Sequence, residues 1–543
     1  MGLPQVMSGV RQPRRLGRWA AVGAIAAIGV TWLAWDTATD DNPSLNDATY
    51  DRIDAYIQDQ VADSHIPGVA IAVVEGGADV HTAGFGDDGH GNAITAETPF
   101  WVGSNTKSIT ALATMQLAEA GAVDLDTPVQ TYVPQFRVAD PAAAVRITVR
   151  HLLNQTSGIA RIDGVRAVAD AEEDQTLEDT VADMADLELN RPVGESFEYA
   201  NLNSVLLGAV IEAATGERWQ DYVQSNIFDR IGMARTYTEK AEAEANGLTG
   251  THRFMFGYPV KTDGPHLAAL APSGYLYSTA NDMARYLALY LQGGIIDGDQ
   301  ILSRAGIDEM LTAATNERSL DLQSQRFTAR YGAGWFVGPF GAAADARWHQ
   351  GSLPHFTGWM VLLPQTDQGV IVLINAGNQF EIGDANAAWS RIPQGVVNIL
   401  RDQPAPTGMS TSRFFIIFNT LAAIAITLQI TTLIGLARTP NRPARWPLAW
   451  ELTVAPAILL LYPGITGGLG FSAAFAFIPD LTITVIGVCG LAIITGGVRI
   501  TRLLRRDRDF PSEPASPTES GPLREIPRGE ELDRAPRPRR RTA

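Results

Sequence analysis

The chain has 543 residues, of which 45% are hydrophobic, and its formal net charge is −17. Its single cysteine, Cys489, excludes an intramolecular disulfide framework and a cysteine-rich metal site. Residues 37–412 hold 48 acidic and 22 basic side chains. Such a surface repels phosphate, so we expect no nucleic-acid partner.

The N-terminus carries four arginines before the uncharged run 19–35. The core of a signal peptide usually spans roughly 7–15 apolar residues and ends at a small-residue cleavage site. This run is longer and lacks a clean cleavage site, which favours an uncleaved transmembrane anchor over a signal sequence. Residues 1–18 are then predicted to be a cytoplasmic N-terminus.

Residues 45–400 are predicted to form one exported domain, because β-like runs alternate there with helical ones. The run "NTKSITALATMQLAEAGAV" has apolar residues at helical spacing and ends near Gly121. Ser104 would lie at its N-terminus and Lys107 one turn later on the same face. Only two other lysines occur in the chain, and lysine, unlike arginine, can take up a proton near neutral pH. A plain N-cap role for Ser104 is the alternative.

Two later stretches carry further polar groups. "YAN" at 199–201 precedes an amphipathic helix, and "HQG" at 349–351 opens a strand-like run. With the S-x-x-K at 104–107, these motifs resemble the serine β-lactamase and penicillin-binding-protein superfamily, in which S-x-x-K is followed by Y-x-N and a K-T-G-type element. Their order and separations look like the class C branch and its esterase and peptidase relatives, over roughly residues 48 to 400.

The resemblance implies an α/β (α+β) fold of the β-lactamase/transpeptidase type. We expect an antiparallel sheet flanked by helices, a helical subdomain, and transmembrane α-helices after them. The sequence shows no metal-ligand cluster and no phosphate-cradling glycine motif, so no cofactor is expected.

The resemblance also implies roles for individual residues. Ser104 would attack a carbonyl and form an acyl-enzyme. Lys107, with a pKa lowered by burial near Tyr199, would act as base, alone or together with Tyr199. Tyr199 would return the proton to the leaving group, and Asn201 would hydrogen-bond both the substrate's acyl amide and Lys107. Gln155 stands where relatives often carry histidine, and we interpret it as structural.

The third motif departs from the lactamase pattern. His349 replaces the lysine that fixes the β-lactam carboxylate, and a mostly neutral histidine attracts an anion weakly. The N–H groups of Ser104 and Ser352 are the expected oxyanion hole. Gly351 and His355 are expected to contact the substrate. Glycine would be usual at position 355, so this histidine either shapes the pocket or lies exposed in a loop.

The C-terminal quarter contains three apolar segments that are predicted to span a membrane: 414–437, 446–465 and 481–498. Buried core helices are the alternative. Arginines lie at most of the predicted cytoplasmic boundaries, which places 37–412 outside and the tail, 507–543, inside as a disordered segment. We therefore expect a multi-pass protein of the cell membrane, in contact with membrane lipid, whose catalytic domain is extracytoplasmic.

The predicted function is a serine hydrolase that acts on a small-molecule or peptide substrate with an ester, amide or peptide carbonyl. The arrangement also looks like that of membrane peptidases that unmask acyl-D-amino-acid prodrugs. One alternative is a slow-deacylating penicillin-binding receptor that signals through its spans. Another is a true β-lactamase, which His349 disfavours.

Overall fold

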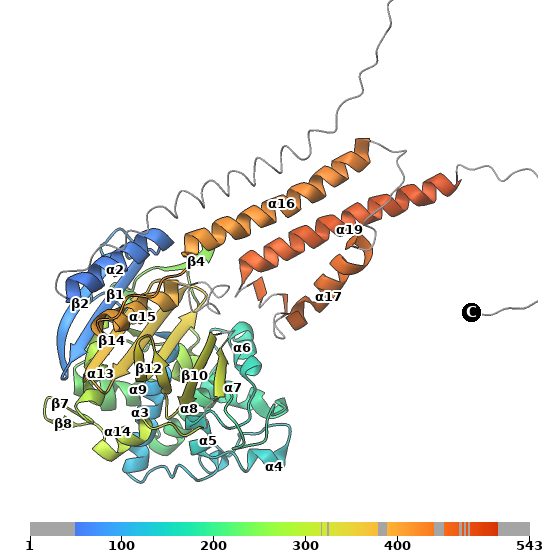
Figure 1. Cartoon of the computed structure of the whole chain (residues 1–543). Coiled ribbons are helices and arrows are strands. Elements are labelled where there is room, and N and C mark those ends of the chain that lie inside the picture. The colour runs from blue at the N-terminus through green and yellow to red at the C-terminus, as the bar shows by residue number, and fades with distance from the viewer. Residues whose placement is uncertain are drawn as a thin grey trace, which may run out of the picture.

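The computed structural model describes residues 49–508, except 316–317, 323–324, 378–387, 439–449, 466–469, 472–473 and 476–477 (Figure 1). The predicted N-terminus 1–18, the predicted anchor 19–35 and the tail beyond residue 508 lie outside the described residues.

An eight-stranded antiparallel sheet, in the order β2-β1-β14-β13-β12-β11-β10-β9, forms the centre of the domain. Its strands are β1 (Gly68–Glu75), β2 (Ala78–Gly86), β9 (Arg318–Leu322), β10 (Gln325–Tyr331), β11 (Phe336–Phe340), β12 (Ala343–Leu353), β13 (Phe356–Leu363) and β14 (Gln368–Ile374). The short strands are β3 (Phe100–Trp101), β4 (Thr251–Met255), β5 (Tyr258–Thr262), β6 (Tyr277–Ser278), β7 (Ile295–Ile296), β8 (Asp299–Gln300) and β15 (Ala376–Gly377).

The described helices are α2 (Thr49–Ser64), α3 (Thr106–Glu119), α4 (Pro141–Ala144), α5 (Val149–Leu153), α6 (Arg161–Asp170), α7 (Leu177–Ala182), α8 (Asn201–Thr215), α9 (Trp219–Val223), α10 (Asp229–Ile231), α11 (Lys240–Ala245), α12 (Ala271–Gly274), α13 (Ala280–Leu291), α14 (Arg304–Met310), α15 (Ala388–Leu400), α16 (Thr411–Arg438), α17 (Ala455–Ile465) and α19 (Pro479–Arg508). Shorter turns are the 3₁₀ elements η1 (Gly103–Asn105), η2 (Val129–Thr131), η3 (Asp183–Asp186) and η5 (Ala268–Leu270), and the π-helices η4 (Gln224–Phe228) and η6 (Trp450–Val454).

Each face of the sheet is covered by helices. Strand β1 shows this directly, since successive side chains of a strand point to opposite faces. Ala70 and Ala72 belong to the larger core with α3, α8 and α13, while Val69 and Ile71 belong to a second core with α2 and α15. Helices α5, α6, α7 and α9 pack on α8, which in turn packs on α3 (Figure 1). The predicted β-lactamase-type fold is therefore confirmed.

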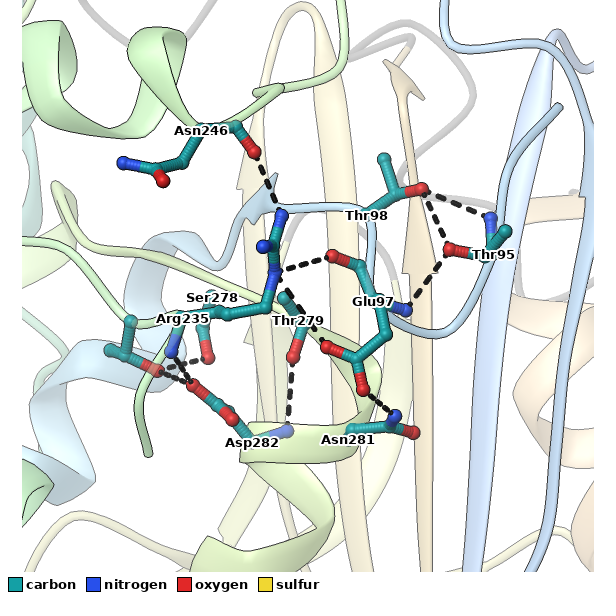
Figure 2. Close-up of polar contacts among 10 residues, drawn as sticks. Thr95, Glu97, Thr98, Arg235, Asn246, Ser278, Thr279, Asn281 and Asp282 are labelled. Atoms are coloured by element: carbon teal, nitrogen blue, oxygen red, sulfur yellow. Dashed lines mark hydrogen bonds and ion pairs between the residues drawn. The ribbon is translucent and has the colours of Figure 1, made fainter. Parts of the chain in front are cut away.

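A polar network holds the loop that leads into β3 (Figure 2). The Arg235 N–H donates to the Asp282 carboxylate (2.7 Å), and its guanidinium donates to the Glu97 carbonyl (3.0 Å). The Glu97 carboxylate lies 3.6 Å from the same guanidinium and accepts a hydrogen bond from Asn281 in α13. Because Glu97 shortly precedes β3, these contacts fix the strand that carries the chain to Ser104.

The C-terminal helices lie together on one side of the domain (Figure 1). Helices α16 and α19 are long and apolar enough to cross a membrane. Both begin beside the domain, and their far ends meet where Arg502 donates to the Leu436 carbonyl. In the chain, η6 and α17 come between these two helices; they pack on α19 and run in the opposite direction, since Glu451 pairs with Arg499 near the far end of α19 and Tyr462 with Thr482 near its start.

The predicted apolar segments are thus found with different lengths. The 414–437 segment lies in α16, which has 28 residues, and the 481–498 segment lies in α19, which has 30. The described part of 446–465 is a π-helix of 5 residues followed by an α-helix of 11. The described residues of this middle segment, 450–465, are therefore helical throughout.

Candidate active site

Ser104 lies in η1, in the connection between β3 and α3. Pairing of β3 with β6 and a hydrogen bond from the Val102 N–H to the Leu276 carbonyl (3.0 Å) fix this connection. Gly103 has a φ of +55°, a conformation that glycine adopts without steric cost. The chain therefore turns sharply just before the serine and enters α3 directly after it.

Lys107 lies one turn into α3, as its spacing from Ser104 predicts. Its Nζ donates to Ser104 Oγ (2.9 Å) and to the Ser273 carbonyl (2.6 Å). The side chain is buried, and burial lowers the pKa of Lys107 well below its ordinary value of 10.5. No carboxylate among the described residues offsets this effect. Lys107 is therefore poised to be neutral beside a serine hydroxyl.

Tyr199 lies next to this pair. Lys107 Nζ is 5.0 Å from the centroid of its ring. Desolvation raises the pKa of the Tyr199 phenol above its ordinary value of 10, and a hydrogen bond with Ser104 opposes that rise. The phenol is therefore protonated near neutral pH, and its O–H can donate a hydrogen bond. The structure thus brings Ser104, Lys107 and Tyr199 together.

Gln155 holds the segment that carries Tyr199. Its carbonyl accepts from the Glu198 N–H (2.9 Å), and its Oε1 accepts from the Ala200 N–H (2.8 Å) and from Asn203 Nδ2 (2.6 Å). Gln155 itself has a φ of +56°, so its backbone is turned to present both groups. The hydrogen bonds on either side of Tyr199 agree with the structural role predicted for Gln155.

Asn201 is the first residue of α8 and is half-buried. Helix α6 packs closely on Asn201, since a Cβ on Gly164 of α6 would lie 2.9 Å from the main-chain nitrogen of Asn201. The hydrogen bonds described for Lys107 go to Ser104 and Ser273, and none of those described joins it to Asn201. The contact between Asn201 and Lys107 that the resemblance implies therefore stays a prediction.

Strand β12 brings the third motif against the serine. A Cβ on Gly351 would lie 2.0 Å from the Val102 carbonyl and 2.9 Å from the Ser104 nitrogen, so only glycine fits there. Ser352 follows on β12, opposite Thr357 of β13. The main chain of this strand therefore runs directly beside the Ser104 N–H, as a two-donor oxyanion hole requires.

His349 is fully buried on the same strand. Its Nδ1 pairs with the Gln350 carbonyl (3.0 Å), and its Nε2 lies 3.4 Å from the Tyr331 hydroxyl. Burial is the main cause that lowers the pKa of His349 to about 3, and Lys107 contributes when it is in its protonated form. Its ring centroid is 6.0 Å from that of Tyr199. The imidazole is therefore neutral, with both nitrogens occupied, and its ring contacts that of Tyr199.

His355 is buried rather than exposed in a loop. Its ring meets Trp101 edge-on at 5.2 Å between centroids, and a Cβ on Gly264 would lie 2.3 Å from its Nε2. Desolvation lowers the pKa of His355 to about 3. His355 therefore packs behind Trp101, close in sequence to Ser104, and shapes that side of the site.

The model of the Beta-lactamase family matches residues 53–392. The chain belongs to this family. Among curated relatives, Protein flp of Staphylococcus aureus is 25% identical over 338 residues, covering 62% of this chain and 65% of that protein. Penicillin-binding protein 4 of Amycolatopsis lactamdurans is 33% identical over 249 residues, 44% of this chain and 64% of that protein. The chain thus spans a little less than two thirds of the length of these relatives.

Solved structures show the same fold. The octameric penicillin-binding protein homologue from Pyrococcus abyssi matches with a TM-score of 0.57 and 28% identity, over 65% of this chain and 78% of that one. EstCE1, a hydrolase with promiscuous acyltransferase activity, matches with a TM-score of 0.54 and 20% identity, over 65% and 98%. Both matches support a sheet and helical domain of the β-lactamase type.

Two site residues were missed by sequence reasoning. Ser273 contributes only a carbonyl to Lys107, and a main-chain acceptor leaves no side-chain signal. Tyr331 reaches His349 from β10, a neighbour of the site only through the pairing of distant strands.

Proposed function

We propose that this member of the β-lactamase family is a membrane-anchored, extracytoplasmic serine hydrolase that cleaves an ester, amide or peptide through an acyl-serine intermediate. The observation that carries the proposal is the environment of Lys107. It is a buried amine without a described carboxylate partner, 2.9 Å from a serine hydroxyl at a sharp turn. A structural lysine in such a place would lack compensation for its buried charge.

The reaction follows from the positions of the groups. Neutral Lys107, alone or with Tyr199, removes the proton of Ser104 Oγ as this oxygen attacks the substrate carbonyl. The N–H groups of Ser104 and Ser352 would bind the oxyanion. Tyr199 then returns the proton to the leaving group, and water releases the acyl group by the same steps in reverse order.

The surroundings of His349 support neutral substrates over β-lactams. A charge-assisted hydrogen bond to a substrate carboxylate is worth about 1.5–3 kcal/mol. His349 has a neutral ring with both nitrogens engaged, so it offers no such bond. We therefore expect penicillins to be poorer substrates than uncharged esters or amides.

The direction of the C-terminal helices supports membrane anchoring. Helices α16 and α19 both start beside the catalytic domain, and η6 with α17, which follow α16 in the chain, run back along α19 in the opposite direction. Three crossings would place the domain and the chain end after α19 on opposite sides of a bilayer. The arginine-rich sequence after residue 498 suits the cytoplasmic side.

A substrate panel tests the proposal. Acyl-D-amino acids, short esters and a chromogenic cephalosporin are offered to the full chain in detergent, with Ser104→Ala as the blank. We expect a covalent acyl adduct on Ser104 and continued release of product beyond one equivalent. Product that stops at one equivalent would support the slow-deacylating receptor instead, and faster turnover of the cephalosporin than of the esters would support a β-lactamase.

A further inference from the structure

The turn of the β4–β5 hairpin is joined to two of the C-terminal helices. Asp480, at the start of α19, accepts a hydrogen bond from the Phe256 N–H (2.9 Å). Asn419 of α16 donates to the Phe256 carbonyl (2.9 Å). Asp480 is fully buried. Both main-chain groups of one turn residue are therefore bound by side chains from two different helices.

The turn has an unusual residue in an unusual conformation. Phe256 has a φ of +53°, which is rare for a bulky side chain, and it precedes Gly257 at a φ of +91°. A tight hairpin turn of this kind ordinarily prefers Asn or Gly at its first position. Here the phenyl ring stacks on Phe418 of α16 at 6.4 Å, and a Cβ on Gly257 would lie 2.7 Å from the Cβ of Phe415. The contacts with α16 therefore accompany a turn residue, Phe256, that is unfavourable for this backbone conformation.

The length of α16 indicates where this contact lies. Its 28 residues extend for about 42 Å, whereas the hydrocarbon core of a bilayer needs only about 30 Å, or ~20 residues. The surplus is at the N-terminal end, where Phe414, Phe415 and Phe418 pack on the catalytic domain. Beyond Asn419 the helix exposes apolar side chains such as Leu421, which is 63% exposed. The hairpin turn therefore lies at the level along α16 where the hydrocarbon core of the bilayer would begin.

Apolar side chains at the same level point outward. Tyr258 and Val260, on the same face of β5, are 68% and 42% exposed, and Met409, shortly before α16, is 47% exposed. The Tyr258 ring stacks at 5.9 Å on His65, which pairs with Ser412 in the first turn of α16. Tyrosine is enriched where membrane meets water. We call Tyr258, Val260 and Met409 the interfacial patch.

We propose that the β4–β5 hairpin is a second, non-covalent attachment of the catalytic domain to the membrane. Its turn is clamped by α16 and α19, and the interfacial patch rests in the headgroup layer of the bilayer. This inference rests on the proposed membrane anchoring. Strand β4 also reaches the site, since the His252 N–H donates to the His355 carbonyl (3.3 Å) and His355 packs on Trp101. The attachment therefore fixes the orientation of this wall of the site relative to the bilayer.

Hydrogen exchange in proteoliposomes tests the clamp. Asp480→Leu removes the acceptor of the Phe256 N–H, whereas Asp480→Asn keeps an oxygen in place. We expect amide exchange in peptides that cover 251–262 to be about tenfold or more faster in the leucine variant and close to wild type in the asparagine variant. Equal protection in the leucine variant and the wild type would overturn the clamp.

Spin labels test the bilayer contact without any use of catalysis. Cys489 is the single cysteine, so a Cys489→Ala background accepts labels at Tyr258→Cys, Leu421→Cys in α16 and, as control, Val145→Cys. Val145 is 53% exposed and lies beside α4, far from the C-terminal helices (Figure 1).

We expect collisions with lipid-soluble oxygen at 421 and 258, and collisions with a water-soluble nickel chelate at 145. A label at 258 that behaves like 145, while 421 contacts lipid, would overturn the hairpin inference alone. A label at 258 shielded from both reagents would also overturn it, because the patch would then be covered by protein, such as a second copy of the chain. Aqueous behaviour at 421 would overturn the membrane anchoring and the hairpin inference together. Hydrolysis by Ser104 is measured separately and is affected by none of these outcomes.

Discussion

Two of the buried cations in the described part of the chain, in different regions, have opposite surroundings. Between the C-terminal helices, Arg499 is 7% exposed and its Nε lies 3.1 Å from a carboxylate oxygen of Glu451, itself 1% exposed. This contact is an ion pair without hydrogen-bond alignment. In the catalytic domain, Lys107 is 2% exposed, and its two described hydrogen bonds go to neutral oxygens.

The difference follows from the chemistry of the two side chains. An arginine stays protonated in a protein, so a buried one is stabilised by an opposite charge nearby. A lysine can release its proton when burial disfavours the ammonium form. A lysine without a counter-ion, beside a serine hydroxyl, is therefore suited to accept a proton, while the Glu451–Arg499 pair is suited to hold two helices together.

The largest effect is expected from removing the group that Lys107 serves. Ser104→Ala should lower kcat/KM by on the order of 10⁴–10⁶-fold, because the acyl-enzyme cannot form. The measurement is ester hydrolysis together with labelling by a fluorophosphonate probe. Ser225→Ala, at an exposed serine on η4, is the matched control and should keep wild-type rates. Undiminished labelling of the Ser104 variant would refute its role as nucleophile.

Replacing Lys107 by an arginine, the residue of the paired region, should lower activity nearly as much. Lys107→Arg should lower kcat/KM by roughly 10³-fold or more, since a guanidinium cannot serve as base. Lys240→Arg is the control, because Lys240 is paired with Asp263 at 2.6 Å and needs only its charge. Similar activity in both variants would mean that Tyr199 removes the proton of Ser104 without Lys107.

Breaking the paired region should cost stability instead of activity. Glu451→Gln removes the negative charge beside the buried Arg499 and should lower the free energy of unfolding of the helices by about 3–5 kcal/mol. Unfolding in detergent is followed by circular dichroism. The double variant Glu451→Leu with Arg499→Leu should recover most of the loss, and a single variant as stable as wild type would remove the contrast with Lys107.

The smallest expected effect is a gain in stability rather than a loss. Lys107→Met removes a buried amine, so we expect the inactive variant to be more stable than wild type by about 1–4 kcal/mol near neutral pH. Because the pKa of Lys107 is lowered in the folded state, the unfolded chain binds more protons between that pKa and 10.5.

The stability of wild type therefore rises with pH across that window, and the advantage of the methionine variant shrinks toward pH 10.5. Thermal unfolding of both proteins from pH 6 to 10.5 measures this. A methionine variant that is less stable than wild type at every pH would show that the amine is not penalised by burial.

Local patterns predicted the parts of the site that depend on spacing along one helix. Ser104 and Lys107 face each other because residues three apart lie on the same side of a helix. The apolar run 414–437 likewise predicted α16, since hydropathy requires no partner. The segment 446–465 was harder, because Glu451 and Pro456 interrupt its pattern, and the structure divides it into η6 and α17.

Contacts between distant segments escaped prediction. The carbonyl of Ser273 reaches Lys107 across 166 positions of the chain, and a backbone acceptor has no residue type by which to recognise it. Likewise, Tyr331 meets His349 only because β10, β11 and β12 are neighbours in the sheet. The hydrogen bonds of Asp480 and Asn419 to the main chain of Phe256 depend on helix packing that no short motif encodes.

The protonation of Lys107 is the most direct test of this account, and the rarity of lysine makes it measurable. The chain has three lysines, Lys107, Lys240 and Lys261, so ¹³C labelling at the lysine ε-carbon should give three signals in an NMR spectrum of the full chain in detergent. Lys107→Arg identifies the signal of interest by its loss. We predict that this signal titrates well below pH 10.5, so that a neutral amine is present near neutral pH. A Lys107 signal that remains that of an ammonium group up to pH 10.5 would contradict the role of Lys107 as the base.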